Sequence, residues 1–177
     1  ASAVPYTITY SYSGDANANP ASDTSTTLTV NAAPTTTVVT SSDVDNTTVF
    51  GDSVTFTGTV TANAPSTASP VIGSLTFIEG GTCATPGTVL QAATALNGSG
   101  VATFTTSALS VASHAITACF ADASNFAASS GNKAHTVTKA SSTTTVTFEA
   151  GPYTYRGTPF TATATVTGAG GLSLTPS

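Results

Sequence analysis

Threonine alternates with apolar or small residues along much of this chain, and this two-residue period limits its fold more than any other feature. In residues 54–61, Val54, Phe56 and Val60 occupy alternate positions and threonines fill the positions between. Successive side chains of a strand point to opposite faces, so the apolar set predicts one buried face and an outward threonine face. The same pattern predicts strands at 74–78, 101–105, 115–120 and 136–139. No apolar stripe has helical spacing with a cap, and we predict an all-β protein.

Turn residues separate these runs. They are the pairs Ala64-Pro65, Gly80-Gly81, Pro86-Gly87 and Asn97-Gly98. The last pair predicts a tight hairpin turn, because both of its residues tolerate a positive φ.

The chain also repeats itself at a spacing of about 106–108 residues, which is the length of one β-sandwich domain. Four pairs of segments match at this spacing: 51–61 with 157–167, 35–38 with 143–146, Ile8-Thr9 with Ile116-Thr117, and Asp15-Ala16 with Asp122-Ala123. We therefore expect one complete sandwich at 33–140. It is flanked by the end of one repeat at 1–32 and the beginning of the next at 141–177.

Neither flanking piece is large enough to cover its own apolar face. The first is expected to supply strands at 6–13 and 26–31, and the second strands at 143–149 and 158–167. A lone hairpin is marginal in water and its open edges invite pairing with other chains. We expect the two pieces to be halves of one split sandwich. Its assembly strands are expected to carry Tyr6, Ile8, Tyr10, Leu28, Val30, Val146, Phe148, Phe160 and Val166.

The two halves can form one domain if the C-terminal end of one copy is adjacent to the N-terminal end of the next copy. Placing Ser177 directly before Ala1 produces a run that reads as a loop between strands. We therefore expect 177 residues to be one period of a longer array. The split domain is then completed either by a covalently continuous copy or by strands from a neighbouring subunit, so the partner is the chain itself.

Charge excludes several classes of function. Charged residues make up 6% of the chain, with 3 basic and 8 acidic groups, against about 25% charged residues in an ordinary soluble domain. Such a surface has no cationic footprint for phosphate, so we expect no nucleic-acid partner. No apolar run approaches the ~20 residues that span a bilayer. The missing initiator Met and the absence of a leader are typical of a mature or excised piece.

The central unit resembles a bacterial immunoglobulin-like (Big) repeat of large surface proteins. The stretches that carry this resemblance are 34–38, 50–56, 100–105, 113–118 and 122–126. The flanking pieces resemble halves of a shorter repeat of the MBG type, carried by 12–17, 150–155 and 166–172. The resemblance implies immunoglobulin-like β-sandwich repeats at a bacterial cell surface, in modules that serve mainly as spacers, stalks and fibre units.

We therefore expect a structural repeat unit of an extracellular filament, stalk or surface-layer-type fibre, with no enzymatic activity and no cofactor. The competing hypothesis is an adhesin or glycan-binding module of a secreted or cell-surface protein, with surface glycans as partners.

Cys83 and Cys119 are the two cysteines of the chain. An even count in an extracellular protein favours a disulfide. The alternatives are two buried free thiols or a metal site, although two thiols with scattered histidines lack the spacing of a zinc site.

The few remaining candidates for chemistry have simpler interpretations. Asp43, Asp45 and Asn46 form a possible calcium loop, but a full site needs six to eight oxygen ligands and no other carboxylates clearly converge on it, so a solvated turn is the better interpretation. His114 and His135 fall at predicted strand starts and are interpreted as structural histidines at the surface or half-buried. No serine, histidine and carboxylate set with a nucleophile-elbow context is present.

Overall fold

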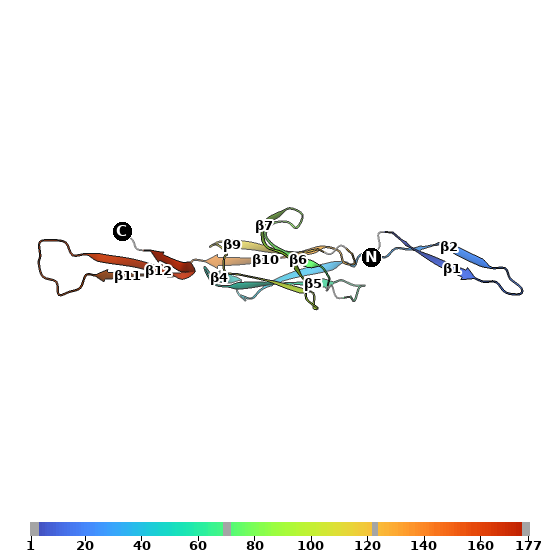
Figure 1. The fold of residues 1–177 in the computed structure, drawn as a ribbon, viewed down its shortest axis with the longest axis horizontal. Coiled ribbons are helices and arrows are strands. Elements are labelled where there is room, and N and C mark those ends of the chain that lie inside the picture. Colours follow the sequence, from blue (N-terminus) through green and yellow to red (C-terminus); the bar gives the residue numbers. More distant parts are fainter. Residues whose placement is uncertain (1–3, 69–71, 122–123, 175–177) are drawn as a thin grey trace. The chain divides into compact units, whose positions relative to one another are not determined.

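The computed structural model describes residues 4–68, 72–121 and 124–174, and these residues form strands, loops and one short 3-10 turn (Figure 1). The strands are β1 (Tyr6–Tyr12), β2 (Ala21–Leu28), β3 (Thr35–Ser41), β4 (Thr47–Val49), β5 (Val54–Ala62), β6 (Ser74–Gly81), β7 (Pro86–Ala95), β8 (Val101–Thr106), β9 (Ser113–Ala121), β10 (Ser129–Thr138), β11 (Ser142–Phe148), β12 (Ala162–Gly168) and β13 (Leu172–Leu174). The 3-10 turn covers Ala169–Gly171. The all-β prediction is confirmed.

The central strands form two sheets, as the prediction of an immunoglobulin-like sandwich requires. One sheet has the strand order β4-β10-β9-β6-β7, and the other has the order β3-β5-β8. Within the first sheet β6 is antiparallel to β9, with Leu75 opposite Phe120 and Phe77 opposite Ala118. β4 and β10 pair in parallel. The immunoglobulin-like all-β class is confirmed.

The chain divides into two compact units. The first contains residues 1–40, 56–104 and 115–133, and the second contains residues 41–55, 105–114 and 134–177.

An aromatic cluster fills the core of the first unit. The Phe104 ring lies 6.3 Å from the Phe56 ring and 5.8 Å from the Phe77 ring, measured between ring centroids. Phe77 belongs to the five-stranded sheet and the other two rings to the three-stranded sheet, so the cluster joins the two layers. Aromatic rings prefer such offset and tilted arrangements.

Gly58 allows the two layers to approach each other closely. A Cβ atom placed on Gly58 of β5 meets Leu75 Cδ1 at 2.5 Å and Ala118 Cβ at 3.5 Å. Its neighbours at alternate positions, Val54, Phe56 and Val60, are buried as predicted. The missing side chain is therefore a packing requirement, because a larger residue at this position collides with β6.

Two predicted turns are the flanks of one hairpin. Gly81 pairs with Pro86, so the strands β6 and β7 extend through the glycine and proline pairs that were expected to be separate turns. The loop between them is closed by a hydrogen bond from Thr82 N to Thr85 O, 3.0 Å long. Gly81 has φ 72°, and a Cβ there meets backbone atoms of Thr85 and Gly87. The strand β7 was not predicted, because Pro86-Gly87 was interpreted as a turn.

The expected hairpin at Asn97-Gly98 is wrong in its connection. Asn97 does organise a turn: its Oδ1 accepts hydrogen bonds from Ser99 N and Val101 N. The turn joins β7 to β8, which belong to different sheets, so it is a link between layers. The positive φ falls on Gly100, at 75°.

Candidate assembly site

The C-terminal sheet gathers its apolar residues on one face, which also carries Thr144 opposite Val166, and its other strand threonines on the reverse face. β12 pairs with β11 on one side and with β13 on the other, both antiparallel. Val146 lies directly opposite Ala164, Phe148 opposite Ala162, and Val166 opposite Leu174. Directly opposed residues share a face, so these six form one apolar face. The reverse face carries threonines at alternate positions of β11 and β12.

This apolar face is not covered by the described residues. The Phe148 side chain is 63% exposed, Val146 and Leu174 are also exposed, and Val166 is half-buried. Apolar burial is what stabilises a sheet in water, and a sheet with one bare apolar face lacks its second layer. The sheet therefore has the pattern of one half of a sandwich.

The N-terminal hairpin has the same one-sided character. β1 and β2 are antiparallel. On the face that carries the tyrosines, Tyr6 lies opposite Leu28, Ile8 opposite Thr26, Tyr10 opposite Asp23 and Tyr12 opposite Ala21, so two polar residues of β2 share this face. A register shift between Ile8 and Tyr10 accommodates an extra residue of β2. Tyr10 is 64% exposed, Tyr6, Tyr12 and Leu28 are exposed, and Ile8 is half-buried.

The complete sandwich shows how residues at the corresponding positions of the repeat are packed. The repeat spacing aligns Tyr6, Ile8, Tyr10 and Tyr12 with His114, Ile116, Ala118 and Phe120. All four of the latter are buried in β9. It also aligns Ala162, Ala164 and Val166 with three buried positions of β5. The same positions are therefore buried within the central sandwich, but exposed or half-buried in the flanking sheets.

The alignment at 143–146 needs a correction of one residue. It places Val146 with Val38, which is 53% exposed, whereas Val39 is buried. A shift of one residue moves every side chain to the other face of a sheet. Val146 lies on the apolar face opposite Ala164, so its structural counterpart is Val39.

The flanking strands have different bounds from those expected. β2 covers Ala21–Leu28 where we expected 26–31, and Val30 follows the strand. β12 begins at Ala162 where we expected 158, because Pro159 offers no N–H to a ladder. Leu172–Leu174 form the short strand β13 where a loop was expected. Phe160 consequently belongs to the loop between β11 and β12.

A charged clasp holds this loop together. Arg156 Nη1 lies 2.5 Å from Glu149 Oε1, and Nη2 donates to Glu149 Oε2 at 2.9 Å. The Arg156 guanidinium beside Glu149, with hydrogen bonds from Thr161, holds the pKa of that carboxyl below its usual range. The guanidinium also lies 4.5 Å from the centre of the Phe160 ring, which packs edge-on against Tyr153. Phe160 is thus bound within its own loop.

The predicted disulfide is present. Cys83, in the loop between β6 and β7, is bonded to Cys119 of β9, and the two Cα atoms are 5.6 Å apart. The bond encloses a separation of 36 residues and ties the end of the β6–β7 hairpin to the middle of the five-stranded sheet.

The calcium candidate is a hydrogen-bonded turn. Asp43 Oδ1 accepts a hydrogen bond from Asp45 N at 3.0 Å, and Asn46 N donates to Asp43 O at 3.2 Å. Asn46 takes φ 56° to close the turn, a conformation that asparagine tolerates. Across the described residues, no three histidine, cysteine, aspartate or glutamate side chains are arranged to hold a metal ion.

Both histidines lie in the second unit and are buried, where the sequence predicts surface or half-buried positions. His135 lies in the middle of β10, not at a strand start, and its Nε2 is 2.9 Å from Thr48 Oγ1. His114 Nε2 is 2.8 Å from the Ser110 carbonyl oxygen. Burial lowers the pKa of His135, an effect that the Asp43 charge opposes and the neighbouring His114 reinforces.

This arrangement predicts a loss of stability in mild acid. Because the pKa of His135 is lower in the folded state, the unfolded chain binds more protons below the ordinary value of 6.5. Stability is therefore complete above that value and falls as the pH drops through the folded pKa, at about 1.4 kcal/mol for each unit of displacement. Thermal unfolding between about pH 7 and 5 measures it. His135→Gln should abolish most of the slope; an unchanged slope contradicts the assignment to His135.

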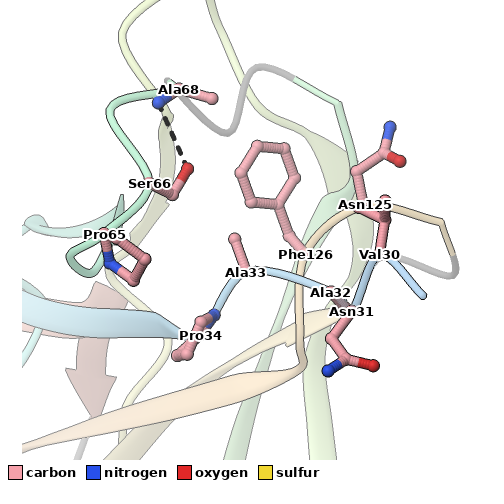
Figure 2. A pocket seen from close by; sticks show the side chains of 10 residues that line it. All are labelled: Val30, Asn31, Ala32, Ala33, Pro34, Pro65, Ser66, Ala68, Asn125 and Phe126. Atoms are coloured by element: carbon pink, nitrogen blue, oxygen red, sulfur yellow. Dashed lines mark hydrogen bonds between the residues drawn. The ribbon is translucent and has the colours of Figure 1, made fainter. Parts of the chain in front are cut away.

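An apolar pocket of about 560 Å³ lies where the chain enters the sandwich. Figure 2 shows the Phe126 ring beside Ala33, with Pro65 and the Ser66–Ala68 turn on the other side. Ala33 is anchored here by hydrogen bonds with Asn125 O and Ala127 N, both 2.8 Å. None of the ten residues that line the pocket is titratable, so it provides no acid–base or metal chemistry.

Two packed sheets with alternate burial define an immunoglobulin-like β-sandwich. No helix among the described residues is long and apolar enough to cross a membrane. The family model of the bacterial Ig-like domain (group 3) matches residues 39–138, and the chain belongs to this family. The matched domain is non-catalytic and typical of bacterial surface proteins. A search of curated proteins found no match.

The family match lies inside the predicted unit at 33–140. It does not cover the flanking pieces, whose resemblance to MBG halves stays a prediction.

Proposed function

We propose that this chain is a structural repeat unit of an extracellular stalk, filament or surface-layer-type fibre, and that copies join through the two flanking sheets. The observation that carries the proposal is the exposed apolar face on each flanking sheet, at positions whose counterparts are buried in the complete sandwich. Two half-sandwiches that bury these faces against each other gain the layer that each lacks.

The family and the disulfide support the cellular location. Bacterial Ig-like domains are typical of surface proteins, and disulfides persist in oxidising compartments outside the cytoplasm. In such a stalk the work is mechanical: load passes through strand ladders and the disulfide restricts the extension of the β6–β7 region.

Concentration-dependent association tests the proposal. The mass of residues 1–177 in sedimentation velocity should rise with concentration, because exposed apolar faces on each copy attract one another. Tyr10→Ser and Phe148→Ser should each weaken association at least tenfold, since an aromatic anchor contributes about 2 kcal/mol or more. Thr9→Ser and Thr147→Ser, on the reverse faces, are the matched controls.

Mixing two variants that each keep one intact face distinguishes a specific interface from non-specific hydrophobic association. A Tyr10→Ser chain keeps an intact C-terminal face and a Phe148→Ser chain keeps an intact N-terminal face, so their mixture should form dimers but no longer species. All five tyrosines lie in the flanking pieces, so protection of tyrosine fluorescence from a soluble quencher reports burial at the joint. A chain that stays monomeric at every concentration, with its tyrosines equally quenched, contradicts the proposal.

A further inference from the structure

The central sandwich supplies a template for how the two flanking sheets meet. Strands β5 and β9 belong to different sheets, and their small residues Gly58 and Ala118 face each other across the core. A Cβ atom on Gly58 lies 3.5 Å from the Cβ of Ala118. At this point β5 and β9 are close enough for two Cβ atoms to be in van der Waals contact.

The sequence repeat transfers this contact to the flanking strands. Ala164 of β12 stands where Gly58 stands in β5, and Tyr10 of β1 stands where Ala118 stands in β9. Ala164 is half-buried opposite Val146 on the apolar face of its sheet, and Tyr10 is exposed opposite Asp23 on the face that also carries Tyr6 and Tyr12.

Compared with β5 and β9, the flanking strand β12 has smaller side chains and the flanking strand β1 has larger ones. β12 has Ala162 in place of Phe56, so its face is flat where that of β5 is bulky. β1 has tyrosines in place of His114 and Ala118, so its face is bulkier than that of β9. Cores are close-packed, and large residues on one layer require small ones opposite. The small side chains of β12 therefore leave room for the tyrosines of β1.

The exposed area matches a weak, reversible joint. A tyrosine buries about 150–250 Å² when fully covered, and about half of the surface of Tyr6, Tyr10 and Tyr12 is exposed. Three half-exposed tyrosines with Leu28 and Ile8, against a matching face, remove about 1,000 Å² in total at most, which lies at the low end of specific interfaces, where association is weak and reversible.

From this match we infer that β1 of one copy packs across β12 of a second copy, with Tyr10 seated on Ala164. The inference rests on the proposed function and adds its partner strands and register. Each copy carries one β1 face and one β12 face, so a second copy supplies the complement of each.

Site-directed cross-linking tests the register. Tyr10→Cys and Ala164→Cys chains are mixed and oxidised, and the native cysteines are already paired. If the Cβ atoms lie as close as in the template, they are within disulfide reach. Because Tyr10→Cys also removes the aromatic ring, both controls lack it too: a mixed dimer should form at least tenfold faster than when Tyr10→Ser/Thr9→Cys replaces Tyr10→Cys, or when Thr165→Cys replaces Ala164→Cys. Equal or faster cross-linking of these reverse-face controls overturns the register.

A size exchange gives an independent readout. Ala164→Phe should weaken association at least tenfold, and adding Tyr10→Ala to the same chain should restore it, because total volume at the joint is recovered. A failure of this rescue overturns the proposed contact.

The outcomes also separate the register from the wider proposal. If the wild-type chain associates but the predicted cross-link does not form, the fibre proposal stands and the β1–β12 register is wrong. If the wild-type chain stays monomeric, the fibre proposal and the register are both wrong. A cross-link confined to single chains carrying both cysteines overturns the second copy as partner.

Discussion

Phe77→Ala should remove about 3–5 kcal/mol of the free energy of unfolding of the central sandwich, the cost typical of truncating a fully buried phenylalanine. Phe77 is 0% exposed, and its ring packs on Phe104 of the opposite sheet. The deletion leaves a cavity between two layers that cannot close without moving both sheets. Because small domains are stable by about 5–15 kcal/mol, this loss should lower the thermal midpoint by more than about 10 °C.

The measurement must avoid tyrosine fluorescence. The five tyrosines all lie in the flanking pieces and the chain has no tryptophan, so calorimetry or circular dichroism must follow the sandwich. Phe148→Ala is the matched control, because it removes the same side chain from an exposed position in β11. A similar loss of sandwich stability in both variants contradicts the assigned core.

Removing the disulfide should have an effect of similar size. The double variant Cys83→Ser/Cys119→Ser opens a loop of 36 residues, and the chain-entropy model assigns such a loop about 3–4 kcal/mol. The variant should therefore unfold at a much lower denaturant concentration, with the midpoint measured by circular dichroism.

Reduction of the wild-type chain provides the control for this prediction. The reduced protein should match the double variant, because both lose the same cross-link while the rest of the sequence is intact. If the double variant keeps the wild-type midpoint, the bond between the β6–β7 loop and β9 contributes nothing to the folded state.

Titration of His135 and titration of Glu149 should change the free energy of unfolding in different pH ranges. The pKa of Glu149 is lowered by Arg156, so its contribution is present above the ordinary carboxyl range and is lost as the pH falls below it. Loss of stability between about pH 7 and 5 therefore reports the histidine, and a further loss in stronger acid reports the carboxylates.

The period-two pattern determined much of this protein. It was sufficient for the all-β class and for the buried faces of β5 and β9, because strand side chains alternate whatever the surroundings. The repeat identified which flanking strands are related to β5 and β9. The cysteine pair also followed from the sequence, since an even count of two favours a disulfide.

Tertiary packing decided the rest. Gly80-Gly81 and Pro86-Gly87 carry the same local signals whether they are two turns or the sides of one hairpin, and the pairing of β6 with β7 selects the hairpin. Asn97 makes a turn in either case, but the partner of β8 is β5, and that choice depends on long-range pairing. Val146 and Val38 share a sequence context, yet their faces differ by one step of register. Local chemistry determines which residues form strands and turns, whereas the partner and the face of each strand are set by contacts between residues far apart in the chain.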